Sequence, residues 1–535
     1  MSAEPSKTPN ILVLMADQMT PRALSAYGGQ VAKTPNIDRL GREGVVFENA
    51  YCNSPLCAPS RYALMSGQLP SATGGYDNAA EFSASTPTFA HYLRDAGYLT
   101  VLAGKMHFCG ADQLHGFEER LTTDIYPADF GWTPDWRRPG ERLDWYHTMD
   151  SVTQAGVCAR SNQIDFDEEV VFAARRKLFD LARGDDRRPF CMVVSLTHPH
   201  DPFTIAEPWW SRHAPKDIDP PRTAAGDAPD DPHSVRLRKV IGLEVQPVSD
   251  AQTQAARRAY YGACAFVDDG FGQVLQALAD AELADDTIVV LIADHGEMLG
   301  ERGLWYKMSF FDPSCRIPMI VHAPGRFAAR RVAASVSLVD LLPTMMDLAG
   351  ATPAFAAPIA GRSLAPHLRG EAGPDGVVGE YLAEGAIAPI VMLRQGRWKF
   401  VHCPADPDQL YDMEADPEEL HNLAARPDSA ETVADFRAQI AERWDLSRLA
   451  EQVLDSQSRR RFVARALSQG THTAWDHQPF QDASQLYMRN TIKLDDLEAR
   501  ARFPRPAASG AHDTGVAEDI GGGAQPVTIG APSAD

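Results

Sequence analysis

Long apolar runs and paired cysteines are both missing from this chain of 535 residues. No stretch reaches the roughly 18 consecutive apolar residues of a membrane-spanning helix, so we expect no membrane span. The eight cysteines include no C-x-x-C pair, and several lie inside apolar runs. A zinc ribbon or a disulfide framework is therefore not expected, and most of these cysteines are predicted to be reduced core residues.

Basic residues are scarce relative to acidic ones. The chain has 51 Lys and Arg against 72 Asp and Glu, which gives a formal net charge of −21. Such a surface repels nucleic acid and anionic membranes, so neither is expected as a partner. It also disfavours a purely anionic substrate unless the site is locally basic, whereas a cationic or zwitterionic substrate meets no such penalty.

The N-terminal segment lacks the features of a signal peptide. "MSAEPSKTPNILVLMAD" carries one lysine and a short apolar run that ends in Asp17 without a small-residue cleavage site. This pattern favours a first strand over a secretory leader, and we therefore expect a cytoplasmic protein.

Apolar runs of strand length recur along the chain, with helical segments between them. The runs are apolar on both faces, as parallel strands covered by helices are, so we predict an α/β fold with a large, mostly parallel sheet flanked by helices. The predicted strands are 11–16, 99–104, 190–196, 288–293 and 318–323. The predicted helices are 34–44, 165–184 and 253–283.

The chain is too long for one compact core, so one large domain with additions is expected. Residues 1–375 are predicted to form the α/β domain. Residues 376–429 indicate a smaller α+β subdomain of short strands followed by a helix within 408–424. Residues 430–504 are predicted to be a polar helical extension that packs against a neighbouring subunit, which makes a homo-oligomer the expected state. The tail, 505–535, is rich in Pro, Gly, Ala and Ser and is expected to be disordered.

Two of the predicted strands end in the same way, one at Asp17 and the other at Asp294. Ligands gather beyond the carboxyl ends of parallel strands, so these carboxylates could hold a divalent cation, with Gln18 and His295 beside them. Each aspartate could instead cap a following helix. The repeated ending favours the metal.

Cys57 lies just ahead of a short predicted helix, "PSRYALMSG" (59–67), in which Pro59 suits the first turn and Gly67 suits the stop. Unpaired N–H groups and the helix dipole favour negative charge there and would lower the pKa of a thiol. This position alone leaves open whether Cys57 is a nucleophile, a metal ligand, a disulfide half or the precursor of another group.

The segment "CAPSR" (57–61), with Ser66 and Gly67 beyond it, resembles the C-x-P-S-R signature of the type I sulfatases in the alkaline phosphatase superfamily. In that family a maturing enzyme oxidises the cysteine to Cα-formylglycine, whose hydrated aldehyde is the nucleophile. The resemblance implies that Cys57 is a precursor and that Arg61 neutralises sulfate oxygens.

Further motifs follow in the family's order. "GKMH" (104–107) resembles G-K-x-H, which implies that Lys105 contacts sulfate and that His107 lies beside the aldehyde hydrate and removes its second proton. "PHDP" (199–202) matches a segment whose histidine contacts the ester, here His200. "GLWYKMSFFD" (303–312) supplies the second sulfate-binding lysine, Lys307. His200 is expected to protonate the leaving alcohol, and Lys307 is the alternative donor.

The resemblance also implies the metal ligands: Asp17, residue 57, Asp294 and His295. Many sulfatases carry a second Asp where this chain has Gln18, and Asn where it has His295. Gln18 is therefore not expected to bind the ion directly. Both departures are known in the branch that contains choline-sulfatases and phosphonate monoester hydrolases. We expect Ca²⁺, with Mn²⁺ or Mg²⁺ as alternatives.

Residues 103–145, together with shorter segments between about 9 and 504, resemble the choline-sulfatase branch. This implies choline-O-sulfate as substrate, a zwitterion that an acidic protein does not repel. Its trimethylammonium group has no N–H and would be held by aromatic faces, worth roughly 0.5–2 kcal/mol each, and by carboxylates. The resemblance implies choline contacts from Asn78, Trp132, His147, Glu384 and Asp495.

For Trp136, Trp145 and Tyr146 the sequence favours packing. A phosphonate monoester or phosphodiester hydrolase with the same nucleophile is the nearest alternative function. A non-catalytic relative that binds a quaternary ammonium ligand is a further one.

Overall fold

A nine-stranded sheet is the centre of the computed structural model, which describes residues 8–351 and 353–470. The strands run in the order β11-β2-β10-β8-β1-β6-β3-β4, and β9 pairs with β2. All pairings are parallel except those of β9 and β10. The bounds are β1 (Asn10–Ala16), β2 (Val45–Tyr51), β3 (Leu99–Gly104), β4 (Glu119–Arg120), β6 (Phe190–Leu196), β8 (Thr287–Ala293), β9 (Arg316–Ile317), β10 (Met319–His322) and β11 (Arg330–Ser337).

The five predicted strands are confirmed as β1, β3, β6, β8 and β10. In the first four of these, every residue is buried, because helices cover both faces of the sheet. The strand direction expected for 318–323 is corrected, because β10 runs antiparallel between β2 and β8. The sequence analysis missed β2 and β11, since polar residues such as Glu48 and Asn49 interrupt their apolar character.

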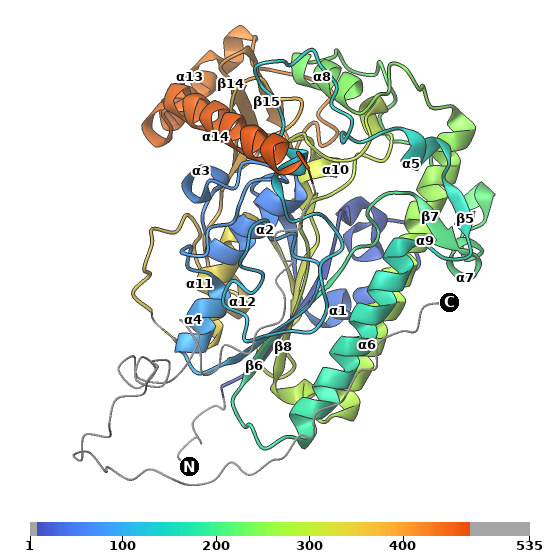
Figure 1. Ribbon diagram of the computed structural model, residues 1–535, viewed down its shortest axis with the longest axis vertical. Coiled ribbons are helices and arrows are strands. Elements are labelled where there is room, and N and C mark those ends of the chain that lie inside the picture. Colours follow the sequence, from blue (N-terminus) through green and yellow to red (C-terminus); the bar gives the residue numbers. More distant parts are fainter. Residues whose placement is uncertain (1–7, 352, 471–535) are drawn as a thin grey trace, which may run out of the picture. The chain divides into compact units, whose positions relative to one another are not determined.

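Helices lie on both faces of the sheet, with α6 and α9 on one side and α2, α4, α11 and α12 on the other (Figure 1). The predicted helices are confirmed as α1, α6 and α9. In the part of the chain that the structure describes, no helix is long and apolar enough to cross a bilayer. The bounds are α1 (Pro35–Glu43), α2 (Cys57–Ser66), α3 (Pro70–Thr73), α4 (Phe89–Asp95), α5 (Asp150–Thr153), α6 (Asn162–Arg183), α7 (Glu207–Trp210), α8 (Pro232–Val240), α9 (Asp250–Asp280), α10 (Asp312–Cys315), α11 (Leu341–Leu348) and α12 (Ala365–Arg369).

A separate antiparallel sheet follows in the C-terminal region, in the order β12-β13-β14-β15. Helix α13 packs its apolar side chains on this sheet, and α14 follows it. The bounds are β12 (Val377–Tyr381), β13 (Ile390–Gln395), β14 (Trp398–Cys403), β15 (Asp406–Asp412), α13 (Ala430–Arg443) and α14 (Leu446–Leu467). A two-stranded sheet pairs β5 (Gly156–Cys158) with β7 (Thr204–Ala206).

The helix predicted within 408–424 is wrong. This segment is β15 followed by turns. Asp412 accepts hydrogen bonds from the backbone N–H groups of Glu414 and Ala415, and Asp416 accepts from Leu420. Short acidic side chains that bind nearby backbone in this way compete with helix formation.

The proposed domain limits at 375, 429 and 504 stay predictions. The predicted choline contact Asp495 and the predicted disordered tail, 505–535, lie outside the described residues. All eight cysteines lie within the described residues, where each is free.

The order of the central strands brings the site together. Strands β8, β1, β6 and β3 are neighbours, and β1 pairs with β8 in register up to Ala16 opposite Ala293. Asp17 and Asp294 therefore leave adjacent strand ends. Neither begins a helix, so the capping alternative does not apply. The ends of β6 and β3 bring in the segments that carry His200 and Lys105 at the same edge.

Candidate active site

Four buried side chains meet at the carboxyl edge of the sheet: Asp17, Cys57, Asp294 and His295. One possible ligand atom from each lies within 4.8 Å of all the others. The Cys57 Sγ lies 3.2 Å from His295 Nε2 and 3.9 Å from Asp17 Oδ1. His295 Nε2 lies 3.7 Å from Asp294 Oδ2. Two carboxylates and an imidazole at this spacing form a donor set that fits a divalent cation.

Helix α2 presents residue 57 to this cluster. The helix begins at Cys57 itself, two residues earlier than the sequence predicted, and all of it is buried. Its unpaired N-terminal N–H groups need partners, and Asn78 Oδ1 accepts from the Ala58 N–H at 2.9 Å. Ser60 Oγ donates to the Asp294 carbonyl oxygen at 2.5 Å, which ties the helix to the end of β8.

Arg61 lies behind the cluster and binds both strand-end carboxylates. It donates to Asp17 Oδ2 and to Asp294 Oδ2, each at 2.9 Å. Lys105 forms an ion pair with Asp17, and its ammonium lies 4.1 Å from the centre of the Tyr126 ring. Arg61 and Lys105 are both fully buried, and neither lines the cavity beside residue 57. Arg61 therefore orients the two carboxylates, and the sulfate contacts predicted for Arg61 and Lys105 stay predictions.

The cations around residue 57 make the site locally basic within an acidic protein. Burial by itself would raise the pKa of the Cys57 thiol, but Lys105, Lys307 and His295 hold it well below its usual value. Burial and Cys57 would likewise raise the pKa of Asp17, yet Lys105 and other cations hold it low. Anionic groups are favoured at this position.

Lys307 is fixed by two partners in a buried network. Its ammonium donates to Gln18 Oε1 at 2.6 Å and lies 2.8 Å from His200 Nε2. His200 Nδ1 lies 2.7 Å from the Asp201 carbonyl oxygen, which can only accept. The hydrogen-bond pattern therefore assigns the ring hydrogen to Nδ1, so that Nε2 accepts from Lys307.

Gln18 does not belong to the cation cluster. Its amide nitrogen donates to Glu297, whose other carboxylate oxygen accepts from the Leu299 and Tyr306 N–H groups. Burial raises the pKa of Glu297 to about 7. Gln18 therefore links Lys307 to Glu297.

Four site residues that are not glycine have positive φ angles: Gln18 (64°), His107 (56°), Tyr306 (69°) and Met308 (75°). Each such residue costs on the order of 1–3 kcal/mol unless neighbouring contacts hold it. Those contacts are present, since the Gln18 carbonyl accepts from the Tyr260 hydroxyl at 2.7 Å and the Met308 N–H donates to the Pro55 carbonyl at 3.0 Å. The residues on either side of Lys307, Tyr306 and Met308, are therefore held in the left-handed backbone conformation.

A cavity of about 240 Å³ opens beside residue 57. It is lined by Cys57, Asn78, His107, Tyr126, Trp132, Trp145, His147, His200, Asp201, Pro202, Lys307 and Glu384. His107 is buried, and neither of its ring nitrogens has a partner. A histidine that faces a cavity in this way is free to exchange a proton with a ligand.

The cavity also contains an unpaired acid. Glu384 is 2% exposed, and neither carboxylate oxygen has a hydrogen-bond partner. Burial, followed by the negative charge of Asp77, raises its pKa to about 7. The Trp132 and Trp145 rings lie nearby with centres 6.4 Å apart and planes at 14°. A buried carboxylate without a partner requires a cation to be stable in its charged form.

Most predicted site residues therefore meet around one cavity, although their roles stay predictions. The sequence analysis did not assign to the site four residues that line the cavity: Tyr126, Trp145, Asp201 and Pro202. It also missed Glu297, which binds Gln18. Trp145, for which packing was favoured, lines the cavity, whereas Trp136 and Tyr146 are buried away from it. Tyr126 carries no local signal, because its contacts with His200 and Lys105 exist only in the folded chain.

Comparison with known families gives three matches along the chain. The family model described as "Sulfatase" matches residues 9–351. One described as "N-sulphoglucosamine sulphohydrolase, C-terminal" matches residues 300–445. A third, described as "Choline sulfatase enzyme C terminal", matches residues 451–503.

Individual relatives agree with these matches. A choline-sulfatase of Rhizobium meliloti (strain 1021) is 46% identical over 508 residues, which cover 93% of this chain and 99% of the relative. An uncharacterized sulfatase of Escherichia coli (strain K12), YidJ, is 33% identical over 356 residues, or 64% and 68% of the two chains. Among solved structures, the phosphonate monoester hydrolase of Agrobacterium radiobacter has a TM-score of 0.66 at 25% identity, covering 83% of this chain and 96% of that one.

Cation binding is expected to stabilise the protein through Asp17 and Asp294. Adding Ca²⁺, Mn²⁺ or Mg²⁺ to chelator-treated protein should raise the unfolding free energy by about 2.7 kcal/mol at a concentration one hundred times the dissociation constant. Asp294→Asn should remove most of this increment, whereas Asp455→Asn, at an exposed position, should keep it. Thermal or urea unfolding with each ion measures the effect. An equal increment in the Asp294 variant would place the ion elsewhere.

Proposed function

This chain belongs to the sulfatase family and is a sulfuric ester hydrolase, and from that premise we propose that it hydrolyses choline-O-sulfate to choline and sulfate. The similarity to the Rhizobium meliloti choline-sulfatase supports the proposal. The observation that carries it is the unpaired, buried carboxylate of Glu384 in a cavity with Trp132 and Trp145.

A quaternary ammonium group suits this part of the cavity. It carries a positive charge but no N–H, so it needs aromatic faces and a carboxylate instead of hydrogen-bond acceptors at fixed angles. Asn78 and His147 complete the choline end, and we retain Asp495 as a further contact. Because the substrate is a zwitterion, the overall charge of −21 does not repel it.

The opposite end of the cavity is suited to the sulfate group. We propose that Cys57 is converted to formylglycine, whose hydrate supplies the hydroxyl that attacks sulfur. A cation held by residue 57, Asp17, Asp294 and His295, with Ca²⁺ still our expectation, would withdraw charge from the ester when bound. Lys105 and Lys307 stabilise the sulfate oxygens as negative charge moves toward the leaving group.

The hydrogen-bond pattern favours Lys307 over His200 as the group that protonates the leaving alcohol. Since His200 Nε2 accepts from Lys307, it has no hydrogen to donate in this state. Two hydrogens of the Lys307 ammonium point to Gln18 and His200, and the third is available to the leaving oxygen. His200 would then orient Lys307 and share its proton.

His107 is proposed to act in the second half of the reaction. Its ring nitrogens have no protein partner, and it lines the cavity beside residue 57. It can therefore take the proton of the remaining hydroxyl while the bond from carbon to the sulfated oxygen breaks, which releases sulfate and restores the aldehyde.

A phosphonate monoester hydrolase is the second candidate, since a structure with that activity has the same fold at 25% identity. The buried carboxylate at the choline end disfavours it, because Glu384 needs a cationic ligand. A non-catalytic binder of quaternary ammonium compounds would leave Cys57 as a thiol.

Protein purified from its native host should carry converted Cys57 and should prefer choline-O-sulfate. The peptide with residue 57 should show the mass decrease from CH₂–SH to CHO, and Cys57→Ala should lose activity by several orders of magnitude. Mass spectrometry followed by kcat/KM for choline-O-sulfate and for a phosphonate monoester measures both. An active preparation with an unmodified thiol, or a preference for the phosphonate, would refute the proposal.

Choline recognition should weaken as the pH falls through about 7, where Glu384 takes up a proton in the empty enzyme. Because its pKa is raised, the neutral acid predominates below this pH and loses its attraction for the ammonium. The ratio of kcat/KM for choline-O-sulfate to that for phenyl sulfate should fall by about tenfold, equivalent to about 1.4 kcal/mol. Glu384→Gln should give a low ratio at every pH. A ratio independent of pH in the unmodified chain would contradict this role.

We further propose a cytoplasmic homo-oligomer that depends on a maturing enzyme to oxidise Cys57. Residues 430–504, which form the helices α13 and α14 up to residue 467, are the expected subunit contact. Light scattering should give a mass above the 58.5 kDa of one chain. A monomer at working concentration would contradict this expectation.

A further inference from the structure

We propose that Arg460 determines substrate specificity by positioning the walls of the choline end without touching the substrate. This inference rests on the proposed function, since it assigns the residue that shapes that end of the cavity. Arg460 lies on α14, is 6% exposed and does not line the cavity. Its guanidinium joins two segments that do line it.

The first segment contains Asn78. Arg460 makes a bidentate ion pair with the buried Asp77, with Nη1 and Nη2 each 2.7 Å from a carboxylate oxygen. Asp77 directly precedes Asn78, which faces the cavity. Two parallel hydrogen bonds fix the angle of a carboxylate as well as its distance. Arg460 therefore controls the direction in which the Asn78 segment enters the cavity wall.

The second segment contains Trp132. The same Nη1 atom donates to Thr133 Oγ1 at 3.1 Å, and Thr133 directly follows Trp132. Thr133 Oγ1 in turn donates to the Phe130 carbonyl at 2.8 Å, which closes the short turn that carries the tryptophan. The Arg460 side chain thus links two parts of the cavity wall that lie far apart in the sequence, one carrying the Asn78 amide and the other the Trp132 ring.

Neighbouring residues on the same face of α14 reinforce this link. Gln457 accepts from the Trp136 N–H at 2.9 Å, and Arg461 pairs with Asp135. Positions i, i+3 and i+4 of a helix share one face, so Gln457, Arg460 and Arg461 all meet the loop that follows Trp132. Trp136 then donates from its ring to the Ala383 carbonyl at 2.8 Å, beside Glu384.

The sulfate end depends less on Arg460, whose one link to it runs through Asp77 and Asn78 to the Ala58 N–H. Helix α2 is held at residue 57 by Ser60 and Arg61, which bind the strand-end aspartates. The family matches also separate the two ends. Arg460 lies in the segment matched by the choline-sulfatase C-terminal model, which begins at residue 451 within α14, whereas Asp17, Cys57, Asp294 and His295 lie in the general sulfatase match. Loss of Arg460 should therefore weaken choline recognition much more than sulfate chemistry.

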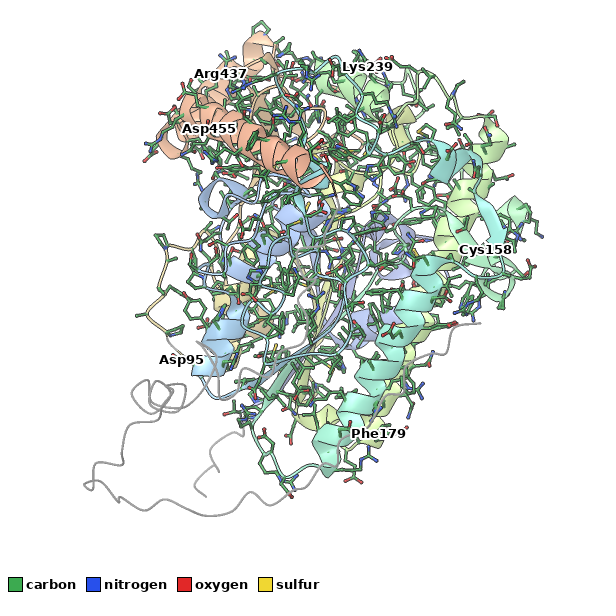
Figure 2. The ribbon with its side chains drawn as sticks, in the orientation of Figure 1. Asp95, Cys158, Phe179, Lys239, Arg437 and Asp455 are labelled. Atoms are coloured by element: carbon green, nitrogen blue, oxygen red, sulfur yellow. The ribbon has the colours of Figure 1, made fainter. Side chains whose placement is uncertain are left out.

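The test compares Arg460→Lys and Arg460→Met with the control Arg459→Met, at an exposed position paired with Asp455, which Figure 2 labels on α14. For the Arg460 variants, KM for choline-O-sulfate should rise by about tenfold with little change in kcat, and the Kd of choline should rise in parallel. For phenyl sulfate, kcat/KM should change by less than about threefold. The control should match the unmodified chain. Calorimetry with choline does not require converted Cys57.

Arg460→Met leaves Asp77 buried without a partner and could unfold the chain. The double variant Asp77→Asn with Arg460→Met removes that charge and should show the same selective rise in KM. Parallel losses with both substrates, or no change with either, would overturn the inference. Failure of the proposed function is distinguishable, because the unmodified chain would then show no preference for choline-O-sulfate before any variant is made.

Discussion

Repulsion between two buried carboxylates is the constraint on which this site depends. The in-register pairing of β1 with β8 brings Asp17 and Asp294 to adjacent strand ends, where water cannot screen them. Arg61 binds one oxygen of each, and Lys105 adds a second positive charge on Asp17. The other oxygen of Asp17 lies 3.9 Å from Cys57 Sγ and 3.8 Å from His295 Nε2. The other oxygen of Asp294 accepts from the backbone N–H groups of Gln18 and His295. Removing any one of these charges would leave a buried partner with less compensation, so the charges of this group stabilise one another.

The backbone around the site also helps to fix the position of a charged side chain, Lys307. Gln18, Tyr306 and Met308 adopt positive φ angles and are held there by hydrogen bonds. The Gln18 carbonyl accepts from Tyr260, and the Tyr306 and Met308 N–H groups donate to Glu297 and to the Pro55 carbonyl. Strain that is held by packing keeps a side chain in one orientation. Lys307 lies between two of these residues, which explains how a lysine, with its many rotamers, meets Gln18 and His200 at fixed distances.

The cavity has opposite electrostatic requirements at its two ends. Around residue 57 the cations Lys105 and Lys307 favour an anionic group, whereas at Glu384 an unpaired carboxylate and two tryptophan rings favour a cation. A zwitterionic ester meets both requirements at once. The acidic surface of the chain then has little effect on such a substrate, because its net charge is zero.

The sequence by itself determined the α/β class and four parallel strands of the sheet, because buried strands are apolar on both faces. The repeated strand ending and "CAPSR" are local signals that also named the four residues that meet at the carboxyl edge of the sheet, whose role as metal ligands stays a prediction. The sequence could not predict that β10 is antiparallel, that residues 413–424 form turns, or that Tyr126 and Trp145 line the cavity. Only the tertiary structure decided these features, and the link from Arg460 to Asn78 and Trp132. Each depends on contacts between segments far apart in the chain, and no local pattern encodes those contacts.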